Sequence, residues 1–446
     1  GDTGHGRAGL GHAHRPGTAR CGYAAGVRPH VCGLQGPLSG AEGQHAPAAP
    51  GPAAADRLDP AVARAESQRI LAEVAKARNL AVKSEVTVDV IDKAGIRAFA
   101  KASMYEHTTV AELRMLGRIE ASLGVLPLGS DPEQVILDLL EQGVLGLYDP
   151  KKKTLFIGDF VSSSMLSMVV GHEIAHGLQD MYFDLDKLQE PMLHQSDAES
   201  ARRFLIEGEA QAAYLAWVSG ERGVAALEEP VLDALGDQAL ELAGLASPYP
   251  ILARSLQMPY ADGTATVARM VKRGGWAAID ALYDKLPETT EQMLHIDKLV
   301  AREPAIPAKM DSGSLDALAA KAGLALVWHD NLGEAALLAM LAESGDARPA
   351  RRAAAGWGGD HFVAFDRKDA AIDGPPTMLA AVTVWDSKED AIEFEAAFRV
   401  YLAEHAAAGH VIDRKDRRVV FATGVPAQIG ADALRTALWR GAHVGK

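Results

Sequence analysis

The chain has 446 residues, with 45 basic against 59 acidic side chains and a formal net charge of −14 at neutral pH. An acidic balance of this size argues against nucleic acid or anionic lipid as a partner. The most apolar stretch is interrupted by His172 and Glu173, so it falls short of the roughly 18 apolar residues that a membrane span needs, and no transmembrane span is predicted.

The first 56 residues differ in composition from the rest of the chain. They are rich in Gly, Ala, Pro, His and Arg, show no apolar periodicity and contain both cysteines. We predict a disordered tail whose histidines belong to a flexible segment and not to a metal site. No apolar core of a signal peptide is visible in it. The remaining residues are enough for two domains with substantial cores.

From Pro60 onward the pattern alternates between helices and strands. The predicted elements, in chain order, are a helix over 60–80, a strand over 85–91, helices over 94–116 and 132–142, and strands over 144–148 and 154–157. Residues 149–153 have the composition of a turn. The resulting hairpin is either purely structural or an edge on which an extended peptide binds by backbone pairing.

The next segment carries the most informative motif of the chain. From residue 161 it reads VSSSMLSMVVGHEIAHGLQDMYF, which predicts a helix that begins near residues 162–164 and is apolar nearly all round. Because His172 and His176 are four residues apart, both imidazoles face one side of the helix and can bind one ion. Glu173 points slightly off that line, where it can deprotonate a metal-bound water. Burying these side chains without a partner would cost several kcal/mol, which favours a divalent cation over a solvated polar stripe.

A second helix supplies a candidate for the third ligand that a catalytic zinc requires. A capping box over 196–199 is predicted to start it, and Gly220 to close it. Glu207 lies between apolar residues of this helix, and Gly208 beside it lets another helix approach closely. We favour Glu207 as the ligand, with a surface pair between Glu207 and Arg203 as the alternative.

Helices are predicted to continue to about residue 299, with breaks near Pro248 and Pro250 and at Gly274 and Gly275. After Pro304 the pattern changes. The predicted elements there are strands over 324–328, 361–365, 378–385 and 419–422, and helices over 333–343, 387–405 and 431–439. This order predicts an α+β layer with helices on one face, which we interpret as an accessory domain over 301–446.

At the histidines and glutamates the chain resembles the gluzincin metallopeptidases, in which the HExxH helix is followed by one whose glutamate completes a zinc site. The context EGEA at Glu207 is similar to the E-G-x-A of the zinc aminopeptidases among them. The resemblance implies one zinc per chain held by His172, His176 and Glu207, with Glu173 as the general base. Thirty residues separate His176 from Glu207, more than in those families, so a loop over 184–195 is expected between the helices.

A longer region, over 146–298, is similar to a group of poorly characterised bacterial HExxH proteins. The similar segments outside the two helices are 258–263, 274–276 and 290–295. This likeness implies a zincin-like, mainly helical catalytic domain over 57–300 with a small mixed sheet, and an α+β class for the whole chain. It also implies export to the periplasm or the extracellular space, and it identifies no substrate.

The predicted function is zinc-dependent hydrolysis of peptide bonds in a peptide or protein substrate. The alternatives are a zinc-binding but catalytically inactive protein with a recognition or assembly role, and a fold without metal. A hydrolase also needs a hydrogen-bond donor to the developing oxyanion. The residues considered for that role are Tyr214, Tyr260, His194 and His295, each of which could instead be a packed aromatic or a surface histidine. Asp180 could orient a ligand imidazole or simply end its helix facing water.

Overall fold

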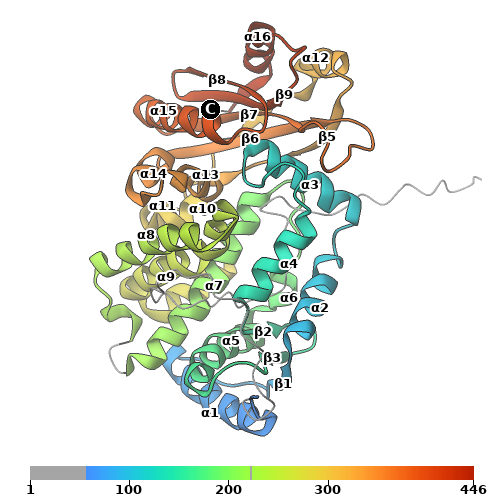
Figure 1. The fold of residues 1–446 in the computed structure, drawn as a ribbon. Coiled ribbons are helices and arrows are strands. Elements are labelled where there is room, and N and C mark those ends of the chain that lie inside the picture. Colours follow the sequence, from blue (N-terminus) through green and yellow to red (C-terminus); the bar gives the residue numbers. More distant parts are fainter. Residues whose placement is uncertain (1–56, 221–222, 446) are drawn as a thin grey trace, which may run out of the picture.

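A computed structural model describes residues 57–220 and 223–445, so the predicted disordered tail lies outside the described residues. Most of the described chain is helical, with a small sheet at one end of the molecule and a larger sheet at the other (Figure 1). The predicted α+β class, mainly helical at first and richer in strands toward the C-terminus, is confirmed. In the part of the chain that is described, no helix combines the length and apolarity needed to cross a bilayer.

The small sheet has three strands, β1 (Thr87–Ile91), β2 (Gly146–Asp149) and β3 (Thr154–Gly158). Their order is β1-β3-β2, with β3 parallel to β1 and antiparallel to β2. The predicted hairpin is therefore present, and β2 is an edge strand. Helix α1 (Pro60–Arg78) shares a core with this sheet and with the helix that carries the HExxH motif.

The single helix predicted over 94–116 is wrong, because the chain forms two helices there, α2 (Lys93–Met104) and α3 (Val110–Leu123). Thr109 and Glu112 form a capping box that starts α3, which ends the first helix and redirects the chain. Helix α4 (Pro132–Gly143) follows as predicted. Helix α3 packs on the C-terminal sheet, where Arg118 makes two bonds of 2.8 and 2.9 Å to the Asp366 carboxylate.

The middle of the chain is a set of helices between the two sheets (Figure 1). They are α5 (Ser163–Phe183), α6 (Leu185–Leu188), α7 (Ser196–Val218), the 3-10 turn η3 (Val224–Ala226), α8 (Glu229–Ala246), α9 (Pro250–Asp284), α10 (Thr290–Leu294) and α11 (Ile296–Ala301). The predicted break at Gly274 and Gly275 is a kink within α9. The predicted capping box at Ser196 is wrong, because its hydroxyl instead donates 2.8 Å to Asp330 of the C-terminal region.

The C-terminal region is built on a five-stranded antiparallel sheet in the order β5-β6-β7-β9-β8. Its strands are β5 (Ala325–Asp330), β6 (Trp357–Asp366), β7 (Met378–Trp385), β8 (Gly409–Lys415) and β9 (Arg418–Val425), and β4 (Ala308–Met310) pairs with β10 (Ala442–Val444). Its helices are α12 (Asp316–Lys321), α13 (Gly333–Leu341), α14 (Ala347–Ala354), α15 (Lys388–His405) and α16 (Ala431–Gly441), with 3-10 turns η4 (Ser312–Ser314) and η5 (Ala342–Ser344).

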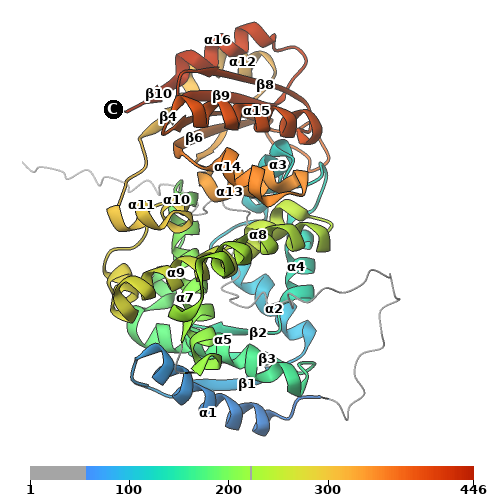
Figure 2. The same ribbon diagram turned by 90° about the vertical axis from the view of Figure 1, so that its left-hand side faces the viewer.

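The prediction of helices on one face of this sheet is wrong. Helix α15 buries Phe394 and Phe398 in the core on one side, whereas α16 buries Leu434 and Leu438 in a separate core on the other (Figure 2). The three central strands β6, β7 and β9 are almost continuously buried for this reason, most clearly β7. Strands β4, β8 and β10 and helices α12 and α14 have no counterpart among the predicted elements.

Candidate metal centre

The two histidines lie in the buried half of α5, between residues whose apolar side chains pack against α1, α7 and the small sheet. His172 and His176 are 0% exposed, and Glu207 of α7 is 2% exposed. Every residue of α5 from Val169 to Asp180 is buried, so the polar residues of this part have no solvated face to occupy. Three ionisable side chains are thus held inside the protein by the packing of two helices.

The ligand atoms of these side chains converge on one point. The His172 Nε2 atom lies 3.1 Å from His176 Nε2, and Glu207 Oε2 lies 3.5 and 3.3 Å from those two nitrogens. Within the described residues they are the one group of three or more His, Cys, Asp or Glu side chains placed to hold a metal ion. The alternative in which Glu207 pairs with Arg203 is not what the structure shows.

Two glutamines fix the outer side of the imidazoles. Gln179 Oε1 lies 2.7 Å from His176 Nδ1, and its amide nitrogen donates 2.9 Å to the Ile206 carbonyl, which sets the orientation of the amide. The His176 Nδ1 atom must therefore carry a proton, so its Nε2 atom presents a lone pair to the site. Gln211 Oε1 is 3.0 Å from His172 Nδ1 and acts in the same way.

These contacts test whether the residues fit a metal. Three lone-pair atoms that face one another repel, and Glu207 Oε2 is buried with no hydrogen-bond partner. A tetrahedral ion with bonds of about 2.0–2.1 Å keeps its ligand atoms about 3.3 Å apart. The observed separations of 3.1, 3.3 and 3.5 Å bracket that value, so the group fits a tetrahedral cation.

The protonation states agree with this arrangement. Burial lowers the pKa of His172, which favours the neutral imidazole that can bind a metal. Burial alone would raise the pKa of Glu207, but the two imidazoles beside it hold that pKa below its ordinary value and keep the carboxylate ionised. The two shifts favour a neutral imidazole at His172 and an ionised carboxylate at Glu207, the forms in which these side chains bind a metal.

Glu173 is fully buried beside this group, and neither of its carboxylate oxygens has a hydrogen-bond partner of good geometry. Burial, and then the Glu207 carboxylate, raise the pKa of Glu173 well above its ordinary value, and the backbone amide of Tyr148 opposes this shift. The edge strand β2 borders it, since a Cβ added at Gly146 would lie 3.4 Å from Glu173 Cγ. Glu173 is therefore a buried carboxyl group without a committed partner, next to both the candidate ligands and a strand edge.

Glu207 is positioned by a close crossing of α7 and α9. A Cβ added at Gly208 would lie 2.3 Å from the Gly263 carbonyl carbon, and one added at Gly263 would lie 2.4 Å from the Phe204 carbonyl oxygen. Only glycine fits at such a separation of backbones. The expectation that Gly208 permits a close helix approach is confirmed.

A buried network supports Gln179 from behind, and no sequence pattern had indicated it. The Gln179 amide donates 2.8 Å to Glu209, whose other oxygen accepts 2.6 Å from Arg78 Nε. Arg78 also binds Asp280 at 2.5 Å, and the Tyr283 hydroxyl donates to Glu209. Glu209 is therefore a supporting residue of the centre and not a ligand.

Both interpretations of Asp180 are wrong. Its carboxylate accepts 2.8 Å from the Tyr148 hydroxyl, 2.6 Å from Lys153 Nζ and 3.0 Å from the Leu185 backbone amide. It is buried and contacts neither imidazole. Asp180 lies in the last turn of α5, close to Lys153 of the hairpin and to the start of α6. These donors are nearer to its carboxylate than the His176 imidazole is.

The four candidates for an oxyanion donor lie in different places. Tyr260 is close to the centre, because its ring lies 5.6 Å from the His172 ring. Tyr214 packs against Gly171, where an added Cβ would lie 2.7 Å from Tyr214 Cδ2, so it fills the α5–α7 interface. His194 stacks at 3.8 Å on His329 of the C-terminal sheet.

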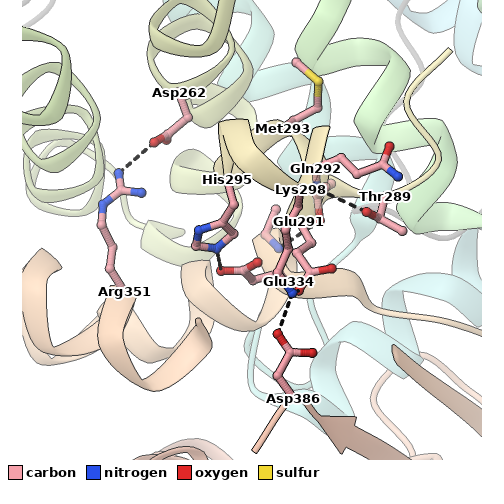
Figure 3. Close-up of polar contacts among 12 residues, drawn as sticks. Asp262, Thr289, Glu291, Gln292, Met293, His295, Lys298, Glu334, Arg351 and Asp386 are labelled. Carbon is pink, nitrogen blue, oxygen red and sulfur yellow. Dashed lines mark hydrogen bonds and ion pairs between the residues drawn. The ribbon is translucent and has the colours of Figure 1, made fainter. Parts of the chain in front are cut away.

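His295 lies outside the centre as well. Its Nε2 atom is 2.7 Å from Glu334 of α13, in a separate set of polar contacts (Figure 3). Of the four candidates, Tyr260 is therefore the one whose ring lies against an imidazole of the candidate centre.

Comparison with known proteins reaches only the C-terminal region. Residues 325–442 match a family described as "Domain of unknown function (DUF8575)", a range that runs from the first residue of β5 to the first residue of β10. No curated protein matches the chain. No solved structure matches it either. The metal centre lies outside the matched range, so its chemistry is argued from its own geometry.

Proposed function

We propose that the chain is a zinc-dependent hydrolase of peptide or other amide bonds. His172, His176 and Glu207 would hold the ion, and Glu173 would act as the general base. The observation that carries the proposal is the convergence of three lone-pair atoms within 3.5 Å of one another, beside a buried carboxylate with no committed partner.

The donor set favours zinc among common metals. Two imidazole nitrogens and one carboxylate oxygen suit zinc, and three protein ligands leave the fourth position of a tetrahedral ion open, as catalytic sites require. When bound, a zinc ion supplies Lewis-acid chemistry, which makes water acidic near neutral pH and polarises a carbonyl group. A closed structural site would need a fourth protein ligand, and none is grouped with these three in the described residues.

The protein's own groups would then supply proton transfer, oxyanion stabilisation and substrate binding. Glu173 would take a proton from the attacking water and return it to the leaving amine. Tyr260, beside the His172 ring, is our candidate for stabilising the oxyanion. The edge strand β2, which borders Glu173, is our candidate for pairing with an extended peptide.

One observation favours a second candidate, a zinc protein without catalytic turnover. The ligands and Glu173 are all 0–2% exposed, and a substrate must reach them. In that case the metal would stabilise the packing of α5 on α7, and the protein would serve recognition or assembly.

The experiment measures metal and turnover separately. Protein purified without chelator is analysed for metal content, and its activity is measured on a peptide library with and without a chelator. We expect one zinc per chain and chelator-sensitive cleavage. The variant Glu173→Gln should keep the zinc and lose at least a hundredfold in rate, whereas Glu190→Gln, an exposed change, should alter neither.

Each outcome discriminates. Zinc with no cleavage of any peptide would favour the second candidate. A chain without metal, or a Glu173→Gln variant as active as the wild type, would contradict the proposed hydrolase.

A further inference from the structure

A second polar site lies apart from the metal centre, in a cavity of about 520 Å³ where helices α8, α9, α13 and α14 meet the C-terminal end of α10. Four carboxylates, three guanidinium groups and one imidazole line it, together with a few small apolar side chains. None of the three metal ligands is among its lining residues. The volume falls within the range of sites for small molecules, which is roughly 300–1,000 Å³.

Two sequence segments that the metal centre does not use come together here. Asp262 belongs to the segment 258–263 and His295 to the segment 290–295, and both side chains line the cavity. Figure 3 shows Asp262 of α9 facing Arg351, and His295, the residue between α10 and α11, facing Glu334. The site therefore joins the helical part of the molecule to the C-terminal region.

Most charges of the cavity are paired within the protein. Arg351 lies 2.9 Å from Asp262 Oδ1 and 2.7 Å from Asp237 Oδ1, and His295 Nε2 lies 2.7 Å from Glu334 Oε1. Gly236 allows the first pair to pack against α8, since an added Cβ would lie 2.6 Å from Asp262 Oδ1 and 2.5 Å from Arg351 Nη2. The walls are thus built around specific ion pairs.

Two acceptor atoms on side chains that line the cavity have no partner. Asp262 Oδ2 and Glu334 Oε2 are buried and have no hydrogen-bond partner, and the two side chains are only 10% and 2% exposed. Burial raises the pKa of both carboxyl groups, and the pairing of Asp262 with Arg351 and of Glu334 with His295 only partly opposes this shift. A ligand that donates hydrogen bonds at this depth would complete them.

An exposed positive charge lies at the rim of the cavity. The Arg348 side chain is 86% exposed, and its closest acidic contact is a distant one, 3.7 Å from Asp237. Its guanidinium group is therefore available to an anion, for which its planar set of donors is well suited. The cavity thus has unpaired hydrogen-bond acceptors in its buried wall and an exposed hydrogen-bond donor at its rim.

We propose that this cavity binds a small zwitterion that carries an ammonium group and a carboxylate, the chemistry of a free amino acid or a very short peptide. The ammonium group would donate to Asp262 Oδ2 and Glu334 Oε2, and the carboxylate would pair with Arg348. This binding does not depend on the metal centre or on hydrolysis.

The test is titration calorimetry of the full chain with each standard L-amino acid and with dialanine. Methylamine and acetate serve as probes for the two halves of the ligand. We expect saturable binding of at least one zwitterion, tighter than that of either half. Asp262→Asn and Glu334→Gln should weaken it roughly tenfold or more. Arg348→Glu changes an exposed side chain, so we expect the variant to fold, and it should weaken zwitterion binding but not methylamine binding.

The control is Arg435→Ala, an exposed arginine on α16, which should leave binding unchanged. The titration is repeated with the His172→Ala variant, because amino acids also bind zinc. Binding that disappears in that variant would place the ligand at the metal centre and overturn the proposal. Absence of saturable binding by every probe, or binding unaffected by Arg348→Glu, would overturn it too.

Discussion

Substituting Gly208 by alanine should disturb the metal centre without touching any ligand. The new Cβ would lie 2.3 Å from the carbonyl carbon of Gly263 and 2.5 Å from its oxygen. Ordinary contacts begin near 3.4 Å, so α7 and α9 must separate by about 1 Å, because the obstructing atoms are backbone and cannot rotate away. Glu207 precedes the substituted residue and would move with it.

The expected change in stability is the difference between two opposing effects. Overpacking a close contact costs about 1–3 kcal/mol, whereas alanine gains about 0.5–1 kcal/mol over glycine in a helix. The metal-free chain should therefore lose up to about 2.5 kcal/mol of unfolding free energy. A displacement of about 1 Å exceeds the tolerance of about 0.2 Å for a metal ligand, so zinc affinity should fall about 10- to 100-fold.

Two measurements test this expectation. Competition with a chromophoric chelator gives the zinc affinity, and urea denaturation of the metal-free protein gives the unfolding free energy. Gly95→Ala in α2 is the matched control, because the atoms nearest its added Cβ are side-chain atoms at 3.3 Å. A Gly208→Ala variant that binds zinc as tightly as the wild type would refute the idea that the α7–α9 crossing positions Glu207.

Three further predictions concern buried polar groups. Gln179→Leu removes the acceptor that fixes the His176 tautomer, so chelator competition should show roughly 10- to 100-fold weaker zinc binding. Arg78→Ala leaves Glu209 buried without its cation, so the unfolding free energy measured by thermal or urea denaturation should fall by about 3–5 kcal/mol. A fall of less than about 1 kcal/mol would contradict the ion-pair argument. Burial raises the pKa of Asp197 to about 8 from an ordinary 3.8. Between these two pH values the folded chain keeps a proton on Asp197 that the unfolded chain releases. The unfolding free energy should therefore fall as pH rises from about 4 to 8. Asp197→Asn should flatten that slope in urea titrations across the range, and equal slopes for both proteins would rule out Asp197 as its source.

Local signals account for the parts of the fold that were predicted. The hairpin of β2 and β3, the helices α4, α5 and α7 and the kink at Gly274 follow from periodicity, turn composition and glycine, all of which act between near neighbours in sequence. The break between α2 and α3 was also readable, because Thr109 and Glu112 have capping-box spacing. The missed strand β8 is an edge strand with several exposed residues, so it carries little apolar alternation.

The sequence by itself determined the spacing of His172, Glu173 and His176, because helix geometry alone places the two imidazoles on one face. It also singled out Glu207, as an acid within an apolar helix. Tertiary structure alone decided that Gln179 and Gln211 hold the imidazoles and that Glu209 pairs with Arg78. These contacts join residues on different helices or depend on the orientation of an amide, so they are set by how closely α7 approaches its neighbours. No local pattern encodes that distance.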